Sequence, residues 1–176
     1  MIIDVRARPL AAPHLGDAQC ADRVFPCALG KSGLRADKRE GDHATPTGVF
    51  PLRRVLYRAD RIAAPATRLP VQPIGERDGW CDDVADPAYN RPVALPYAGR
   101  HERLWRDDGL YDAVLVIGHN DDPVVPGAGS AVFVHVARPD WGGTEGCVAF
   151  RLEDLLWILT AAGPDDRLRI GPAAEA

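Results

Sequence analysis

The sequence lacks the features that identify several classes of protein. No apolar run reaches the roughly 18 residues that a membrane-spanning helix requires. The N-terminal segment has no basic stretch followed by an apolar one, so it does not resemble a secretory signal. The net charge is −4, and residues of both signs are interspersed without a basic stripe. We therefore expect no membrane span and no nucleic-acid partner.

Cysteine is also scarce, and its positions match no C-x-x-C zinc or redox motif. The four cysteines are Cys20, Cys27, Cys81 and Cys147. With 46% apolar residues, the chain can bury a core without disulfides or a metal. A metal site is conceivable, and its ligands would be Cys81, His119, His135 and Cys147. Their spacing is not diagnostic of zinc, so we expect no metal and no cofactor.

Proline and glycine are abundant, with 16 and 17 residues spread along the whole chain. Such punctuation favours many short strands joined by turns over long helices. The length predicts a single domain over residues 1–176, with a frayed C-terminal tail at 171–176. Strands are predicted at 2–8, 23–28, 48–57, 112–119, 131–136 and 166–170. Residues 30–47 are expected to form a long loop, and residues 60–97 to be irregular or short-stranded.

Only one segment has helical spacing. Its leucines fall at i, i+3, i+4 and i+7, which is the pattern of one helix face. They are Leu152, Leu155, Leu156 and Leu159. Two acidic residues occupy the predicted first turn, where the helix dipole favours negative charge, and Gly163 with Pro164 supplies a stop. The predicted fold class is therefore mainly β with one late α-helix and long irregular loops.

The 131–136 segment predicts the setting of one histidine. Its three valines share one face, and His135 shares the other with Ala131 and Phe133. An all-valine face is typical of a core. We therefore expect His135 to line a cleft, and His119 lies at the same end of the sheet if the strand before it is adjacent.

Cys147 follows Gly146 and comes shortly before the predicted helix. A position ahead of a helix N-terminus lowers the pKa of a thiol. The backbone N–H groups of Gly146 and Cys147 could form an oxyanion hole. A histidine base beside a cysteine is the usual arrangement for acyl transfer, and closing the short loop from His135 to Cys147 costs little. The alternative interpretation is a buried cysteine and an unrelated polar histidine.

The residues around this pair resemble a known family. His135, followed by TEGCV at 144–148, is similar to the signature of L,D-transpeptidase catalytic (YkuD-type) domains. Other segments resemble the same family, namely EGDHATPTGVFPL (40–52), GWCDD (79–83), YNR (89–91), HERLW (101–105) and IGHNDDPVVPGAGSAVFVH (117–135). The resemblance covers most of the chain, with its core at 25–160.

The resemblance implies a β-sandwich-like fold and acyl transfer on peptidoglycan stem peptides. It makes Cys147 the nucleophile and His135 the general base. Gly146 contributes backbone to the oxyanion site, and Thr144 shapes the turn. The family's third member, a backbone carbonyl or small polar group that orients the histidine, has no assignment from the sequence.

Two positions depart from the family's pattern. Many members have His where this chain has Glu145, and Arg or Asn where it has Ala149. Stem peptides carry carboxylates, so Arg138 and Arg151, which flank the motif, are candidates to bind them. His119 is a further candidate to line the substrate groove.

The implied mechanism has two steps. The thiol attacks a carbonyl of a tetrapeptide donor and expels the terminal D-residue, and an amine of an acceptor stem then captures the thioester. Capture by water would instead make an L,D-carboxypeptidase or a cross-link hydrolase, and a non-catalytic cell-wall-binding module is a further alternative. A carbapenem is expected to acylate the thiol. The implied substrate points to the periplasm or cell envelope, whereas the absence of a visible signal leaves a cytoplasmic relative as the alternative.

Overall fold

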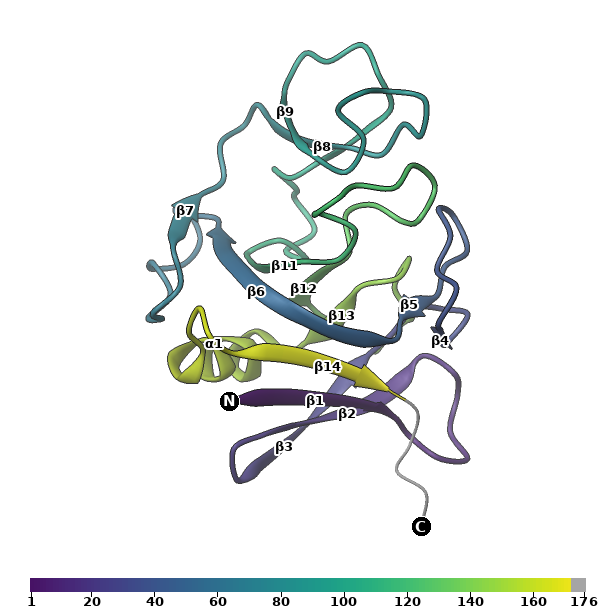
Figure 1. Cartoon of the computed structure of the whole chain (residues 1–176). Helices are drawn as coiled ribbons and strands as arrows, with labels where there is room; N and C mark the ends of the chain where they lie inside the picture. The colour runs from purple at the N-terminus through teal and green to yellow at the C-terminus, as the bar shows by residue number, and fades with distance from the viewer. Residues whose placement is uncertain (172–176) are drawn as a thin grey trace.

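The computed structural model describes residues 1–171, and most of its regular elements are strands (Figure 1). The one helix in this range is α1, Leu152–Ala161. The predicted mainly-β fold with one late helix is therefore confirmed. Of the tail expected at 171–176, Gly171 ends the last strand, and residues 172–176 lie outside the described part of the chain.

Nine strands form the main sheet, and its ladder closes on itself. In spatial order they are β11 (Ala113–Ile117), β12 (Phe133–Val136), β13 (Val148–Phe150), β3 (Arg23–Ala28), β2 (Leu15–Cys20), β1 (Ile2–Ala7), β14 (Arg167–Gly171), β6 (Gly48–Tyr57) and β7 (Val71–Pro73). β11 also pairs with β6. The long strand β6 permits this closure because its first half pairs with β14 and its second half with β11 and β7. The two walls of the expected sandwich-like fold are thus continuous.

Two small sheets complete the structure. One has the order β10 (His101–Arg103), β8 (Asp78–Cys81), β9 (Pro92–Ala94), and the other pairs β4 (Leu34–Arg35) with β5 (Thr45–Pro46). The β8–β9 region lies above the main sheet in Figure 1. The short strands β7, β8 and β9 confirm the expectation for residues 60–97, and the long loop at 30–47 contains only the β4–β5 pair.

Helix α1 packs into the main hydrophobic core through one face. Leu155, Ile158 and Leu159 are buried there, whereas Leu152 and Leu156 are half-buried at its margin. The predicted helix is confirmed, but its leucine stripe does not define the buried face. The buried face runs through residues 155, 158 and 159. Ile158 is therefore buried in the core, whereas two of the four predicted leucines, Leu152 and Leu156, lie only at its edge.

The predicted alternation along β12 is also confirmed. Val132 and Val134 pack into the main core, whereas Phe133 packs into a second hydrophobic cluster with Cys147. This second cluster joins the main sheet to the β8–β10 sheet. The strand begins at Phe133 instead of Ala131 because Ala131 has a φ of 50°, which lies outside the range of a strand.

The other strand predictions agree within one or two residues, but β2, β10, β13 and the short pair β4–β5 are not among the predicted strands. β6 has the predicted bounds, and all five residues of β11 are buried, as expected for a strand paired on both edges. β2 reads LGDAQC, which has no strand-like composition. It is a strand because β1 and β3 pair with its two edges.

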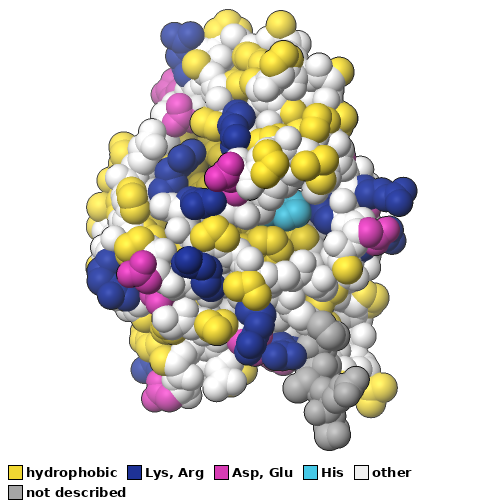
Figure 2. Space-filling model, in the orientation of Figure 1, with side chains coloured by type: hydrophobic (Ala, Val, Ile, Leu, Met, Phe, Trp, Pro, Cys, Tyr) yellow, Lys and Arg dark blue, Asp and Glu magenta, His cyan; other side chains and the backbone are white. Residues whose placement is uncertain are grey.

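The length of the helix and the charges on the surface are relevant to two questions, namely a membrane span and a nucleic-acid partner. Among residues 1–171 no helix has the length and apolarity to cross a bilayer. Figure 2 shows acidic and basic side chains lying next to one another on the visible face, with no continuous basic area. Nothing on this face therefore favours a nucleic acid as a partner.

Candidate active site

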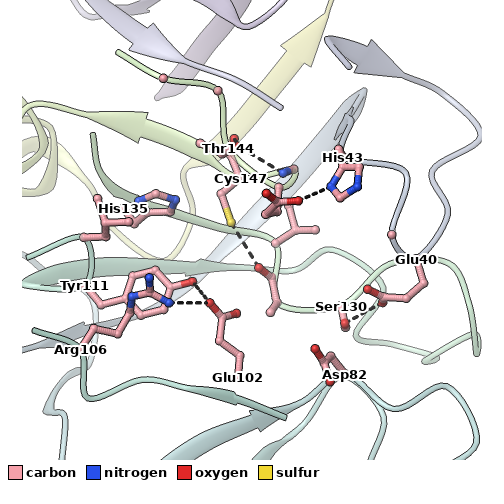
Figure 3. A pocket seen from close by; sticks show the side chains of 18 of the residues that line it. Glu40, His43, Asp82, Glu102, Arg106, Tyr111, Ser130, His135, Thr144 and Cys147 are labelled. Atoms are coloured by element: carbon pink, nitrogen blue, oxygen red, sulfur yellow. Dashed lines mark hydrogen bonds and ion pairs between the residues drawn. The ribbon is translucent and has the colours of Figure 1, made fainter. Parts of the chain in front are cut away.

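A cavity of about 720 Å³ lies where the second hydrophobic cluster meets the surface (Figure 3). His135 and Cys147 both line it, so the structure brings together the two residues on which the sequence interpretation depends. Other walls come from the 40–43 loop, the β8–β10 sheet and residues 142–146. The site is therefore assembled from segments that are far apart in the sequence.

Cys147 presents a buried thiol that is held by the backbone of the preceding strand. Its Sγ accepts a hydrogen bond from the N–H of Phe133 and donates one to the carbonyl of Ala131, each at 3.2 Å. Burial raises the pKa of this thiol to about 12, and the negative charge of Glu102 acts in the same direction. The resting sulfur is therefore a neutral thiol.

The expectation that a helix N-terminus would lower this pKa is wrong. Strand β13 lies between Cys147 and α1, so the thiol is not at the first turn of the helix. Desolvation then dominates, because a buried thiolate loses its hydration without gaining the helix dipole. The sequence showed the short separation from the helix but not the intervening strand.

His135 lies on β12 and is also buried. Its Nδ1 is 2.8 Å from the carbonyl oxygen of Val136, so in the neutral ring Nδ1 carries the proton and Nε2 is the free acceptor. Burial lowers the pKa of His135 to about 4. The ring of Tyr111 packs edge-on against it at 5.4 Å between centroids. No hydrogen bond joins His135 to the Cys147 sulfur within residues 1–171.

The carbonyl of Val136 is the orienting group that the sequence could not identify. A backbone carbonyl leaves no trace in residue type, so no motif could have predicted it. It holds the histidine in the tautomer that a general base requires. Because both the thiol and the imidazole are neutral, Cys147 and His135 do not form a thiolate–imidazolium ion pair at rest.

Two threonines hold the backbone of Cys147. Thr144 Oγ1 donates to the Cys147 carbonyl at 2.7 Å, and Thr45 Oγ1 lies 3.2 Å from the same oxygen. The Thr45 oxygen also accepts from the N–H of Gly30 at 2.8 Å. Thr45 is fully buried, and its side chain connects the 30–47 loop to the turn at 144–147. Sequence reasoning missed this role.

The predicted pair of oxyanion donors is not free in this structure. The N–H of Gly146 donates to Thr144 Oγ1 at 3.1 Å. No described residue accepts from the N–H of Cys147. One donor is therefore available to a substrate oxygen, and the second becomes so only if the Thr144 contact is exchanged.

Gly146 has a φ of 137°, in the range that L side chains rarely adopt. A Cβ at this position would lie 2.9 Å from the carbonyl oxygen of Ala44. The same Cβ would lie 3.5 Å from Nζ of Lys38, whose ammonium forms an ion pair with Asp42. The 30–47 loop thus packs tightly against the turn at 144–147, and only glycine fits at position 146.

The two departures from the family's pattern have different settings. Glu145 is exposed at the cavity rim and forms ion pairs with Lys31 and His43, which lower the pKa of its carboxyl group. Ala149 is fully buried in β13, opposite His135 in the parallel ladder. Neither position presents the side chain that many family members use for substrate.

Of the three predicted substrate contacts, the structure places only Arg138 on this cavity. Arg138 is exposed, and no described residue forms an ion pair or side-chain hydrogen bond with it. Arg151 instead lies over the Trp141 ring, at 5.5 Å from its centroid. His119 lies outside this cavity, contrary to the expectation, and lines a smaller one of about 200 Å³. The chain turns after β11, and His119 Nε2 bonds to the carbonyl of Ala128 at 3.0 Å.

Sequence reasoning also missed an acidic group in the cavity. Glu102 on β10 accepts a hydrogen bond from the Tyr111 hydroxyl at 2.6 Å and lies 3.6 Å from the Arg106 guanidinium. Burial raises the pKa of Glu102, although Tyr111 and Arg106 favour its charged form. Beyond its resemblance to the family, the HERLW segment that contains Glu102 carries no signal of this acid's setting.

The backbone of Ala131, whose carbonyl accepts the hydrogen bond of the Cys147 thiol, is held by Asn90. The buried Asn90 Oδ1 accepts from the N–H of Ala131 at 3.1 Å and from Trp80 Nε1 at 2.8 Å. Trp80 and the neighbouring Cys81 are buried and structural, whereas Asp82 lines the cavity. The 79–83 segment therefore supplies both a wall of the cavity and a support for the backbone around the sulfur.

Within residues 1–171 no three His, Cys, Asp or Glu side chains gather in a way that could hold a metal ion. The chemistry available to the cavity is that of a thiol, an imidazole, and the charged groups around them. A family model described as the L,D-transpeptidase catalytic domain (YkuD) matches residues 16–170. No curated protein matches the chain.

Proposed function

Since the chain belongs to the L,D-transpeptidase catalytic domain (YkuD) family, we propose that it is a cysteine acyltransferase that cross-links peptidoglycan stem peptides. Members of this family act on peptidoglycan peptides. The observation that carries the proposal is the pairing of Cys147 and His135 on one cavity, with Nδ1 of His135 bonded to a backbone carbonyl. This pairing leaves Nε2 as the base beside a thiol.

The first half-reaction forms the acyl-enzyme. The Cys147 sulfur attacks a carbonyl of the tetrapeptide donor while His135 Nε2 takes the thiol proton. Because both groups are neutral at rest, charge develops only as the bond forms, and the N–H of Cys147 supports the resulting oxyanion. The imidazolium then gives its proton to the departing D-amino acid, and the C–N bond breaks.

The second half-reaction consumes the thioester. An amine of an acceptor stem attacks the carbonyl carbon, the C–S bond breaks, and the sulfur regains its proton through His135. Water in place of the amine gives carboxypeptidase or cross-link hydrolase activity from the same intermediate. Arg138 binds a stem carboxylate in this scheme, because it is a cavity cation without an ion-pair partner among the described residues.

Mass spectrometry of the protein and its products tests the proposal. The wild type, incubated with a disaccharide-tetrapeptide, should carry a thioester on Cys147 and release cross-linked dimer. Cys147→Ala should form neither, and it should not be acylated by a carbapenem. Cys27→Ala is the matched control, because Cys27 is a buried cysteine in β3 and does not line the cavity. A carbapenem adduct that persists on Cys147→Ala would refute the assignment, and a wild type that yields only tripeptide would identify a hydrolase.

The proposed substrate places the protein in the periplasm or cell envelope. Fractionation of cells that express the natural gene, followed by immunodetection, tests this location. Recovery in the cytoplasmic fraction alone would point to a different acyl substrate for the same site.

A further inference from the structure

Glu102 is a half-buried acid of the cavity that the acylation mechanism does not use. Oε1 of Glu102 accepts a hydrogen bond from the Tyr111 hydroxyl at 2.6 Å and lies 3.6 Å from the Arg106 guanidinium. Within residues 1–171 no hydrogen bond engages Oε2. That oxygen is not enclosed either, since the one enclosed and unpartnered side-chain atom in residues 1–171 is Nε of Arg54. Oε2 of Glu102 is therefore open to the cavity, and 26% of the side chain is exposed.

Glu102 also lies on the side of the cavity where the sulfur is. In Figure 3 its carboxyl end points toward Cys147, and Tyr111 lies beside it. Tyr111 links Glu102 to the base as well, because its hydroxyl bonds to Glu102 while its ring packs against His135. Among the charged groups, Glu102 has the largest effect on the pKa of the Cys147 thiol, which it raises. A ligand atom bound to Oε2 is therefore well placed to reach an acyl group on the sulfur.

The other acids of the cavity differ from Glu102 in their hydrogen-bond and ion-pair partners. Asp82 forms an ion pair with Arg100 at 3.0 Å. Glu145 is exposed, and each of its two oxygens contacts a different basic side chain. Glu40 accepts hydrogen bonds from two hydroxyl groups that join the loops around it. Glu40 and Asp82 also keep one oxygen without a hydrogen bond, so Glu102 differs from them in the position of its carboxyl group, which points toward the sulfur (Figure 3).

We propose that Glu102 binds the ammonium group of the acceptor and removes its proton, so that the amine attacks the thioester. This inference rests on the proposed function, and it concerns only the second half-reaction. A carboxylate is the natural partner of a primary ammonium, and such charge-assisted hydrogen bonds are stronger than neutral ones. Because burial raises the pKa of Glu102, its carboxylate is a better proton acceptor than an exposed one.

The protons balance through two bases. The acceptor arrives as R–NH₃⁺ and gives one proton to Glu102, which becomes a neutral acid. The free amine forms the new C–N bond and, as the C–S bond breaks, passes its second proton to His135, which returns it to the Cys147 sulfur. Glu102 then releases its proton to solvent. Water needs no such step, so loss of Glu102 should shift the acyl-enzyme from transfer to hydrolysis.

The test is the ratio of transfer to hydrolysis from the same acyl-enzyme. Wild type and Glu102→Gln, each with a tetrapeptide donor, are given either a primary amine that is an ammonium at neutral pH or hydroxylamine, which is neutral. We expect Glu102→Gln to lower the ratio about tenfold or more with the amine, equivalent to about 1.4 kcal/mol, and to leave it unchanged with hydroxylamine. Asp82→Asn, which also removes a carboxylate from the cavity wall, is the matched control and should leave both ratios near those of the wild type.

An unchanged ratio in Glu102→Gln with the ammonium acceptor would overturn the Glu102 inference alone. An equal fall in Asp82→Asn would also overturn it, because the effect would then be general to cavity charge. A wild type that forms no thioester would overturn the proposed function and this inference together. If circular dichroism shows that Glu102→Gln does not fold, Glu102→Asp replaces it with the same expected fall, since its carboxylate is retracted by one methylene.

Discussion

His135 should make the folded protein lose stability in weak acid. Its pKa is about 4 in the folded state, where it is buried, and about 6.5 in an unfolded chain. Between these two pH values the unfolded state binds more protons, so the free energy of unfolding rises with pH. The contribution of His135 is therefore complete above about pH 6.5 and is lost as the pH falls toward 4. The difference between the two pKa values corresponds to about 3 kcal/mol.

Urea denaturation over this pH range measures the effect, with His135→Gln as the comparison. Protonation of carboxylates in other ion pairs also lowers the stability of the protein in acid, but this loss is the same in the wild type and the variant. The difference in free energy of unfolding, wild type minus variant, should therefore rise by about 3 kcal/mol from pH 4 to pH 7. His119→Gln should show a change of the same sign, because burial lowers the pKa of His119 too.

A flat difference, constant within about 0.5 kcal/mol across this range, would refute the reasoning. It would mean that the histidine is solvated in the folded state or protonated in both states. Either result would remove the neutral imidazole that the proposed acylation step requires. Because the measurement uses no substrate, it tests the electrostatics of the site apart from its activity.

Three further predictions concern Cys147 and its surroundings. Gly146→Ala should destabilise the fold by about 1–3 kcal/mol, through backbone strain and contact with the Ala44 carbonyl. Gly41→Ala, also at positive φ but with an open environment, should cost less in the same thermal denaturation assay. Cys147 should react with iodoacetamide at neutral pH about a thousandfold more slowly than a free thiol of pKa about 8.5, because its pKa is about 12. Arg138→Gln should raise KM for a tetrapeptide donor about tenfold or more through loss of a charge-assisted hydrogen bond, with kcat little changed.

Each of these has a clear contrary result. Equal stability losses in the two glycine variants would show that backbone strain alone matters and that the loop yields to the new methyl group. Alkylation of Cys147 at the rate of a free thiol would show that the resting sulfur is solvated. An unchanged KM in Arg138→Gln would remove Arg138 from the substrate site.

Local patterns predicted much of the scaffold. The alternation in 131–136 and the helix over 152–161 are set by side-chain periodicity, which depends only on neighbouring residues. Strand β6 was predicted within its bounds for the same reason. Strand β2 was not, because its residues have little strand propensity and its edges are paired by segments on either side of it in the sheet.

For the site, the sequence by itself pointed to Cys147 and His135, since the residue types and the motif predict their chemistry, and the structure places both on one cavity. Only the tertiary structure decided how they are held and charged. The Val136 carbonyl, the Thr45 hydroxyl and the open Glu102 oxygen reach the site from the backbone or from distant segments. The pKa of Cys147 is raised and not lowered, because burial is a property of the assembled fold that no spacing along the chain encodes.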